Sequence, residues 1–306
     1  MRTVVLFALL VAAAPAHASS YDTLLTFGDS LVDSGNLYAV TGGAVPSAAA
    51  GYNAGRFSNG YNAADYLSKA LFGHYASASV LGGTDFAFGG ARATTNADGI
   101  PDLALQTLLF ANASGGQADP NALYLINAGG NDGFAQVFGA ADAPSAKNVG
   151  MAIAGTISAL SALGARHFLV DNVFDLGNTP IVRAAGLSSV GTADTKAINA
   201  AIGKALAGLM LPAGTDLHLF DAYALGHRFN ADPAAFGLAG INFNLPCTLA
   251  KTWPACTGLG FFDTVHPTDV VYQVFGRALF QTVPEPGMIA LFGLGALALG
   301  AARRRA

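Results

Sequence analysis

The chain has 306 residues, of which 52% are hydrophobic and 11% are charged, whereas about 25% are charged in an average soluble domain. This composition excludes an intrinsically disordered chain, which combines low hydrophobicity with high charge. Because 19 Asp and Glu outweigh 15 Lys and Arg, the charge balance argues against a protein that binds nucleic acid. The apolar excess gathers at the two ends of the chain, which indicates terminal targeting segments on either side of one body.

The first 18 residues have the three parts of a secretion signal. Arg2 precedes an uncharged apolar run over residues 4–14, and Ala16-His17-Ala18 has the small-x-small form of a cleavage site. This pattern predicts a signal peptide over residues 1–18, cleaved after Ala18. A buried N-terminal helix is the alternative interpretation.

Between the ends, short apolar runs alternate with stretches of helical period. Strands are expected at residues 24–27, 85–88, 122–127, 167–170 and 217–220. Helices are expected at residues 62–71, 103–110, 146–163 and 192–211, and from Pro267, as the first helical residue, to about residue 280. Apolar runs of this length suit strands that are buried on both faces of a parallel sheet. The alternation predicts a doubly wound α/β sandwich over residues 19–282, in which ligands bind beyond the carboxyl ends of the strands.

The first candidate for chemistry is a serine directly after the first predicted strand. Gly28-Asp29-Ser30 follows that strand, and the glycine permits a tight turn that places the Ser30 hydroxyl at the carboxyl edge of the sheet. On its own the tripeptide also suits a turn or a helix N-cap. Asp29, Asp33 and Asp132 are expected to bond local backbone rather than to take part in chemistry.

Three further groups are candidate donors to a developing oxyanion. Gly89 and Gly90 follow the second predicted strand, where a glycine lets a backbone N–H approach a substrate closely. Asn131 follows Gly129-Gly130 at the end of the third strand, and its side-chain amide is expected to donate toward the same point as the Ser30 N–H. The alternatives are that Gly89 relieves packing and that Asn131 caps a turn.

Two cysteines, Cys247 and Cys256, lie nine positions apart around Trp253-Pro254. In a protein with a signal peptide such a pair predicts a disulfide that closes a small loop, with two free thiols as the alternative. His167 and His218 lie in predicted strands and are interpreted as structural. No spacing of cysteine, histidine and acidic residues is typical of a metal site, so neither a metal nor a cofactor is expected.

A carboxylate and an imidazole lie close together near the end of the body. Asp263-Thr264-Val265-His266-Pro267 precedes the last predicted helix, and this spacing can place the two side chains within one turn. A serine needs such a base because free serine is a poor nucleophile at neutral pH. The aspartate would hold the tautomer of the imidazole and stabilise its protonated form.

With these blocks in this order, the body resembles the GDSL lipase/esterase family, whose members are also called SGNH hydrolases. The resemblance covers about residues 21–280 and includes the Gly-Arg-Phe-Ser-Asn-Gly segment at residues 55–60. It implies a flavodoxin-like three-layer α/β/α sandwich with a five-stranded parallel sheet, and this strand number agrees with the five strands expected from the apolar runs.

The resemblance also implies a role for each motif residue. The implied catalytic residues are the nucleophile Ser30, the general base His266 and the orienting acid Asp263. The implied oxyanion hole consists of the Ser30 N–H, the Gly89 N–H and the Asn131 side-chain amide, with Gly90 as the alternative to Gly89. No block departs from the family pattern.

The last 24 residues combine a short motif, an apolar run and a basic cluster. Val283-Pro284-Glu285-Pro286 precedes the uncharged residues 287–302, and Arg303-Arg304-Arg305 follows. This order closely resembles the PEP-CTERM sorting signal of Gram-negative bacteria. That resemblance implies a transmembrane helix that holds the precursor in the inner membrane until an exosortase-type enzyme processes it, and then a place at the cell surface or in the extracellular matrix. A simple C-terminal membrane anchor is the alternative.

Taken together, the resemblances imply a secreted serine esterase or lipase that hydrolyses a carboxylic ester through an acyl-serine intermediate. Its candidate substrates are acyl esters, lipids and acetylated polysaccharide, the last because proteins with this sorting signal are linked to an exopolysaccharide matrix. An acyltransferase would use the same site, since the chemistry is shared up to the acyl-enzyme. A non-catalytic protein that binds the matrix through the same scaffold is the third hypothesis.

Overall fold

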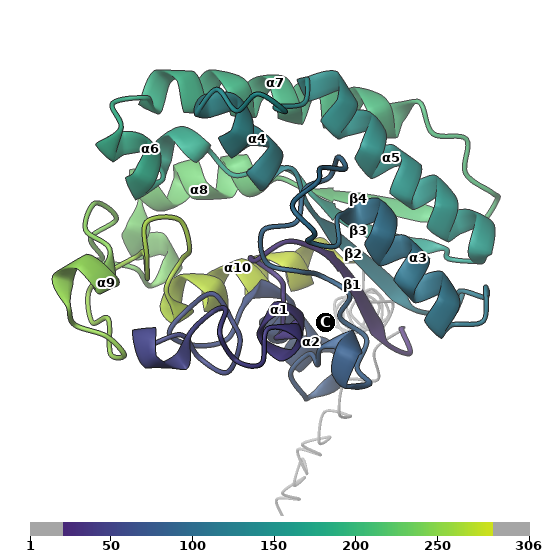
Figure 1. The fold of residues 1–306 in the computed structure, drawn as a ribbon, viewed down its shortest axis with the longest axis horizontal. Helices are drawn as coiled ribbons and strands as arrows, with labels where there is room; N and C mark the ends of the chain where they lie inside the picture. The colour runs from purple at the N-terminus through teal and green to yellow at the C-terminus, as the bar shows by residue number, and fades with distance from the viewer. Residues whose placement is uncertain (1–20, 284–306) are drawn as a thin grey trace, which may run out of the picture. The chain divides into compact units, whose positions relative to one another are not determined.

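A parallel sheet of four strands lies at the centre of residues 21–283, the part of the chain that the computed structural model describes (Figure 1). The predicted signal peptide over residues 1–18 and the predicted membrane helix over residues 287–302 lie outside the described residues. Within residues 21–283, no helix has both the length and the apolar character that crossing a membrane requires.

The strands lie side by side in chain order: β1 (Leu24–Gly28), β2 (Leu123–Asn127), β3 (His167–Asp171) and β4 (Asp216–Phe220). Every residue of β1 and β2 is buried, as expected for apolar strands that are covered on both faces. The register aligns Gly28, Asn127, Asp171 and Phe220 at one edge. The structure therefore confirms the predicted α/β class with a parallel sheet and brings the strand ends together.

The expected fifth strand at residues 85–88 is not a strand in the structure. This segment runs beside β1, where Phe86 N–H donates to Thr26 O at 2.8 Å and Phe88 N–H donates to Gly28 O at 3.1 Å. The ladder stops there because the Gln106 side chain accepts from Gly28 N–H and donates to Gly28 O, both at 2.8 Å. Gln106 thus takes the Gly28 N–H that the next backbone pair would need, while Gly28 O still accepts from Phe88 N–H, and four strands remain.

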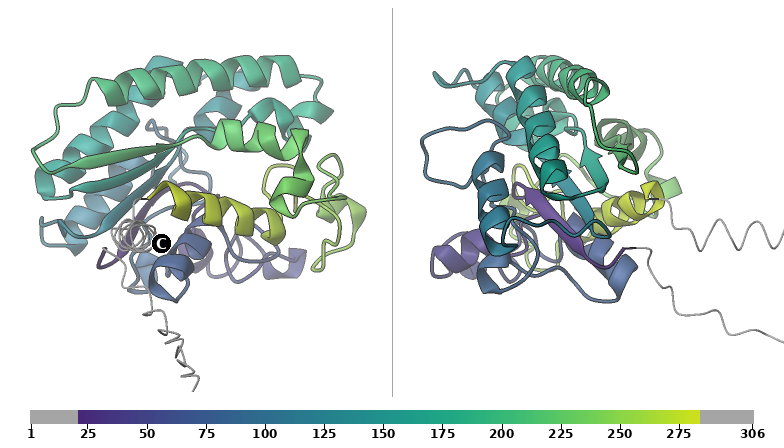
Figure 2. Two further views of the ribbon diagram at one scale, coloured as in Figure 1. Left: turned by 180° about the vertical axis from the view of Figure 1, so that it is seen from behind. Right: turned by 90° about the vertical axis from the view of Figure 1, so that its right-hand side faces the viewer.

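Helices cover both faces of the sheet (Figure 2). One layer contains α2 (Ala63–Phe72), α8 (Ala222–Ala231) and α10 (Asp269–Thr282), and the other contains α3 (Leu103–Ala113), α5 (Ala146–Leu163) and α7 (Ser188–Ala207). Along β2 the buried side chains alternate between these layers, with Leu123 and Leu125 in the first and Tyr124 and Ile126 in the second. The result is the expected sandwich of helices, sheet and helices.

The ends of three helices differ from the prediction. Helix α3 runs three residues past its expected end at residue 110. Helix α7 begins and ends four residues before the expected range of 192–211, because Gly208 is its C-cap and the chain then turns before Pro212. Helix α10 has Thr268 as its N-cap, so Pro267 precedes the cap instead of occupying the first helical position. The shift is small but places His266 in the loop just before the helix.

Short elements in the connections were not predicted. They are α1 (Asn36–Val40), α4 (Gly130–Val137), α6 (Pro180–Ala184), α9 (Cys247–Ala250) and the 3-10 helices η1 (Ala48–Ala50), η2 (Ser79–Leu81), η3 (Leu176–Asn178) and η4 (Pro233–Phe236). The ten-residue helix α8 was not predicted either. Helices α1, α4 and α6 lie in the connections that leave the carboxyl ends of β1, β2 and β3. The carboxyl edge is therefore the end of the sheet where the chain builds most of its irregular structure.

Candidate active site

Ser30 lies in a tight turn at the carboxyl end of β1. Gly28 has a φ of +151°, and a Cβ atom there would lie 2.0 Å from the Asn127 carbonyl oxygen of the neighbouring strand, so only glycine fits. The turn begins at once, since the Val32 and Asp33 N–H groups both donate to Asp29 O. Ser30 is only 7% exposed, but its hydroxyl faces the loop before α10 and not the core.

The structure brings the predicted nucleophile, base and acid into one chain of hydrogen bonds. Ser30 Oγ lies 2.7 Å from His266 Nε2, and His266 Nδ1 lies 2.7 Å from Asp263 Oδ2. The other carboxylate oxygen, Asp263 Oδ1, accepts from the N–H groups of Val265 and His266 at 2.8 and 2.7 Å. An imidazole held in this way has its Nε2 lone pair directed at the serine hydroxyl, which is what proton abstraction from Ser30 requires.

The electrostatics of Asp263 favour its ionised form. Burial by itself would raise the pKa of this carboxyl, but the neighbouring His266, the backbone N–H groups and the Tyr52 hydroxyl lower it to about 2. The carboxylate therefore stays negative at neutral pH. A fixed negative charge at His266 Nδ1 stabilises the imidazolium that forms when Ser30 gives up its proton.

The two candidate glycines of the oxyanion hole have different hydrogen bonds. Gly89 N–H donates to Asp33 Oδ2 at 2.8 Å. Gly90 N–H has no hydrogen-bond acceptor within residues 21–283. Gly90 has a φ of +86°, and a Cβ atom on it would lie 2.7 Å from Ile100 Cδ1, so this position also requires glycine. Of the pair, Gly90 is the residue whose N–H remains available.

The other two candidate donors also keep a free N–H. Asn131, in the first turn of α4, donates from Nδ2 to Ala91 O at 2.8 Å, which fixes the amide and leaves the second Nδ2 proton. The Ser30 N–H makes no hydrogen bond to the described part of the chain. Three donors from three separate segments of the chain thus remain at this edge of the sheet.

Asp33 and Asp132 reach further than the predicted local bonds. Asp33 accepts from Gly35, Asn36 and Leu37 nearby, and also from Gly89, which is 56 residues away. Asp132 accepts from Ala93 N–H at 2.7 Å and from Thr94 N–H at 3.1 Å and Thr94 Oγ1 at 2.6 Å. Both carboxylates therefore hold the loop of residues 89–94 beside the serine. The expectation of local backbone bonds is confirmed for Asp33, which adds the bond to Gly89, and is wrong for Asp132, whose partners lie 38 and 39 residues away.

Asp29 behaves as expected in its contacts, because Oδ1 accepts from Leu31 N–H at 3.0 Å. Its complete burial raises the pKa to about 7, although the Leu31 N–H and the charge of His266 act in the opposite direction. A raised pKa at the residue before the nucleophile is the effect expected when a carboxyl group is excluded from solvent.

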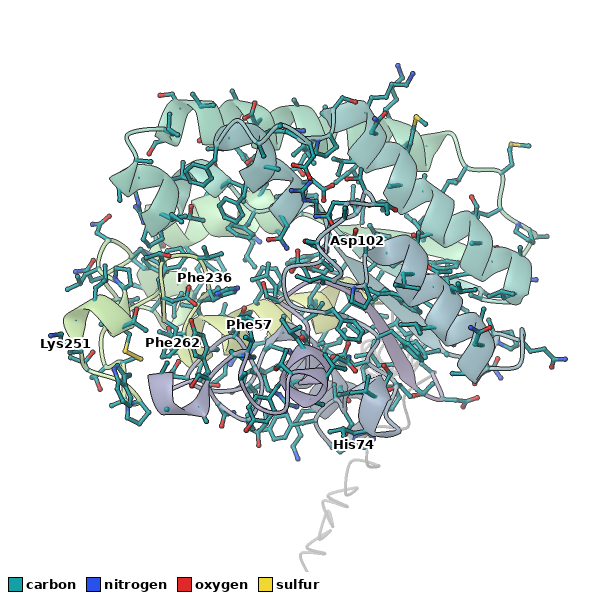
Figure 3. All side chains as sticks on the ribbon, viewed as in Figure 1. Phe57, His74, Asp102, Phe236, Lys251 and Phe262 are labelled. Carbon is teal, nitrogen blue, oxygen red and sulfur yellow. A yellow bond between two sulfur atoms is a disulfide. The ribbon has the colours of Figure 1, made fainter. Side chains whose placement is uncertain are left out.

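Two aromatic residues at the site were not singled out from the sequence. The Tyr52 hydroxyl lies 2.7 Å from Asp263 Oδ2. The Phe57 ring lies 5.1 Å from the His266 ring and would also meet a Cβ atom on Gly89 at 2.2 Å (Figure 3). Phe57 lies in the family-like segment at residues 55–60, which was a usable signal, whereas no motif pointed to Tyr52.

The structure contains a disulfide between Cys247 and Cys256. Both sulfur atoms belong to a small buried cluster with Leu259 and Phe262, directly before Asp263 in the chain. Trp253, in the loop that the disulfide closes, lies over Gly51. The disulfide loop is therefore attached to the same segment that carries Tyr52.

The two histidines in the strands lie beside a carboxylate, away from the candidate active site. His167 and His218 both contact the Asp216 carboxylate, at the amino ends of β3 and β4. Within residues 21–283, no group of three or more His, Cys, Asp or Glu side chains is placed to hold a metal ion. These contacts lie at the opposite end of the sheet from Ser30.

Comparison with known proteins fits this geometry. A sequence model of the GDSL-like lipase/acylhydrolase family matches residues 24–279. The chain belongs to this family. A second model, of the PEP-CTERM protein-sorting motif, matches residues 282–305, which indicates export and sorting in a Gram-negative bacterium.

Two relatives of this GDSL-family chain match it over part of their length. Lipase 1 of Photorhabdus luminescens is 33% identical over 179 residues, which are 58% of this chain and 26% of that protein. An uncharacterized protein in the trpE-trpG intergenic region of Pseudomonas putida is 31% identical over 198 residues, 58% of this chain and 31% of that protein. The chain thus spans between a quarter and a third of the length of these relatives.

Among solved structures, LAE5, an alpha/beta hydrolase enzyme from the metagenome of Lake Arreo in Spain, is similar to the chain at 14% identity. The match covers 87% of this chain and 95% of LAE5, with a TM-score of 0.49.

Proposed function

We propose that the protein is a serine esterase that hydrolyses carboxylic esters through an acyl-serine intermediate. The single observation that carries the proposal is the hydrogen-bonded series Ser30–His266–Asp263, with 2.7 Å at each of its two side-chain contacts. Membership of a family of lipases and acylhydrolases supports the same reaction class. The chain's own residues suffice for this reaction, and no cofactor is needed.

In the proposed mechanism, Ser30 Oγ attacks the ester carbonyl carbon while His266 Nε2 takes the hydroxyl proton. Asp263 holds the Nδ1–H tautomer and faces the positive charge that develops on the ring. The tetrahedral intermediate collapses as His266 gives the proton to the departing alcohol oxygen. Water then attacks the acyl carbon while His266 takes its proton. The bond between the acyl carbon and Ser30 Oγ breaks as His266 gives that proton back to Oγ, and the carboxylic acid leaves.

The oxyanion of the tetrahedral intermediate would accept hydrogen bonds from the Ser30 N–H, the Gly90 N–H and the Asn131 amide. We assign to Gly90 the role that the family resemblance implied first for Gly89, because Asp33 already accepts the Gly89 hydrogen. Asp33 would then stabilise the loop through the Gly89 N–H, while the Gly90 N–H donates to the oxyanion of the substrate. Fixed donors of this kind stabilise a developing charge without reorganising during the reaction.

We propose that the ester carries a short acyl group. Leu31 and Pro267, which follow Ser30 and His266 in the chain, line a cavity of about 80 Å³ between α8 and α10, although Ser30 and His266 themselves do not line it. Pockets that enclose drug-sized ligands are several times larger, at about 300–1,000 Å³. We therefore prefer acyl esters of low molecular weight and acetylated polysaccharide to long-chain lipids as substrates. The match to the sorting motif supports the polysaccharide, because the resemblance to proteins with this motif implies a link to an exopolysaccharide matrix.

Hydrolysis of p-nitrophenyl esters from acetate to decanoate tests the proposal, with Ser30→Ala as the matched control. We expect turnover that is highest for the short esters and that falls by at least about a thousandfold in Ser30→Ala. Release of acetate from native matrix, and product analysis with an added alcohol, then separate polysaccharide deacetylation and acyl transfer from simple hydrolysis. A wild-type protein that is inert on every ester and unreactive toward a fluorophosphonate would refute the proposal and support a matrix-binding protein.

We also propose that the body acts outside the inner membrane, at the cell surface or in the matrix, after an exosortase-type enzyme has processed the tail. The match of residues 282–305 to the sorting motif supports this place of action. Fractionation of cells that express the chain with and without residues 283–306 tests it. Retention of the truncated protein in the same fraction as the full chain would contradict the role of the tail.

A further inference from the structure

We propose that Tyr52 is a positioning residue of the active site, which fixes the Asp263 carboxylate in the orientation that His266 requires. The inference rests on the proposed esterase mechanism, in which Asp263 orients the general base. It adds a fourth side chain to the series Ser30–His266–Asp263, from a loop 211 residues away from the aspartate.

The argument begins with the hydrogen bonds of the carboxylate. Oδ1 is held by the main chain, because the N–H groups of Val265 and His266 donate to it. Oδ2 receives the His266 ring at 2.7 Å and the Tyr52 hydroxyl at 2.7 Å. Without Tyr52, the catalytic imidazole itself would be the one side chain in the described structure that restrains Oδ2. With Tyr52, the carboxylate is fixed independently of the group it has to orient.

The direction of the Tyr52 bond follows from the charges. Burial and the adjacent Asp263 charge both raise the pKa of Tyr52 above its ordinary value, so the phenol keeps its proton and donates it. Asp263 is ionised, with its pKa lowered to about 2 against the effect of burial. The contact is therefore a hydrogen bond from a neutral donor to an anion, which is stronger than one between two neutral groups.

The surroundings hold the Tyr52 ring in place. Its ring meets that of the buried Phe262 edge-on, with 4.7 Å between the ring centroids, and Phe262 directly precedes Asp263. Tyr52 packs on the cluster that contains the Cys247–Cys256 disulfide. On its other side, Gly51 lies beneath Trp253, where a Cβ atom would come within 2.8 Å of the indole. Contacts of Tyr52 with the disulfide cluster and of Gly51 with Trp253 thus hold the phenol next to the carboxylate.

Removing the hydroxyl should change both the speed and the pH dependence of the reaction. In Tyr52→Phe, Oδ2 loses a donor, so its negative charge acts more fully on His266 and the ring binds a proton more readily. Since the base must be neutral to act, the acid limb of the kcat/KM profile should move up by about half a pH unit. The carboxylate is also less fixed, so kcat should fall about tenfold with little change in KM.

Tyr66→Phe is the matched control. The Tyr66 hydroxyl donates to Asp269 Oδ1 at 2.6 Å, so this variant removes the same kind of tyrosine–carboxylate bond at a place outside the active site. It should leave kcat and the pH profile as in the wild type. Thermal unfolding of both variants shows whether either substitution simply loosens the fold.

An NMR titration of the His266 ring, assigned by comparison with His266→Gln, gives a readout that needs no substrate. We expect the His266 titration to move to higher pH in Tyr52→Phe and to stay in place in Tyr66→Phe. A protein without esterase activity would overturn the proposed function, but the titration would still test the Tyr52 contact. Tyr52→Phe refutes the inference if its titration and pH profile coincide with those of the wild type, even when kcat falls, because a loss of speed alone shows only a structural effect.

Discussion

Asp171→Asn should make the protein less sensitive to pH. Asp171 lies at the carboxyl end of β3, where Oδ2 accepts from Asn127 Nδ2 at 2.8 Å and Oδ1 is buried without a partner in the described structure. Burial raises the pKa of this carboxyl to about 8, the Asn127 bond opposes the rise and the charge of Asp29 adds to it. The folded protein therefore holds a proton on Asp171 at neutral pH.

The sign of the effect follows from this raised pKa. In the unfolded chain the carboxyl titrates near its ordinary value of 3.8, so above that pH the unfolded chain has lost a proton that the folded protein keeps. Below about pH 4 Asp171 is protonated in both the folded and the unfolded state, so its ionisation does not lower the free energy of unfolding. Between about pH 4 and pH 8 the free energy of unfolding falls by about 1.4 kcal/mol per pH unit for this one group. From pH 5 to pH 7 the loss amounts to about 3 kcal/mol.

Urea denaturation of wild type and Asp171→Asn at pH 5 and pH 7 measures this loss. Any fixed cost of the amide is the same at both pH values, so the change in the difference between the two proteins isolates the proton. We expect the wild type to lose about 3 kcal/mol relative to the variant over these two units. Asp22→Asn, at an exposed position, is the control and should follow the wild type at both pH values. Parallel behaviour of wild type and Asp171→Asn would show that Asp171 ionises freely in the folded protein, which refutes the reasoning.

Two further predictions concern the oxyanion hole and the disulfide. Asn131→Ala should lower kcat by about a hundredfold to a thousandfold with little change in KM, because it removes one donor to the transition state. Steady-state kinetics on a short p-nitrophenyl ester measures both constants. A variant whose KM rises by that factor while kcat stays unchanged would contradict the prediction. The double variant Cys247→Ser/Cys256→Ser should lose about 2.5 kcal/mol of unfolding free energy, the entropy of closing a loop with a separation of nine residues; an unchanged midpoint in urea would contradict it.

The parts of the site that the sequence indicated are those that follow strands. The predicted strands at residues 24–27, 122–127, 167–170 and 217–220 lie within one residue of β1 to β4. Parallel strands meet at one edge, so a motif directly after a strand is placed as soon as the strand is recognised. Ser30 and Asn131 are of this kind. Residues 85–88 are not a strand because the Gln106 side chain accepts the Gly28 N–H at the end of β1, and no pattern of apolar residues indicates such a replacement.

The glycines and acids of the loops show a different limit. The sequence predicted that Asp33 bonds local backbone, and its partners Gly35 and Leu37 are two and four residues away. The same carboxylate also accepts from Gly89, which is 56 residues away. A carboxylate has room for about four hydrogen bonds, and local spacing accounts only for those that close within a turn. The acceptor site of Asp33 that remains after the local bonds takes the Gly89 N–H and so leaves the Gly90 N–H free, and no sequence pattern predicts which of the two it takes.

The same count of acceptor sites explains why Tyr52 was missed and what could have been expected instead. The Asp263-x-x-His266 spacing fills three sites, two from the main chain and one from the imidazole. Because a buried carboxylate leaves few acceptor sites empty, this count predicts that a fourth donor exists. Its identity depends on a loop 211 residues earlier, whose direction is set by Trp253 over Gly51 and by the disulfide cluster, and not by any periodicity of its own. Counting the filled acceptor sites of Asp263 therefore shows that a further donor can bind there, but the residue that supplies it becomes known only when the loops have been placed.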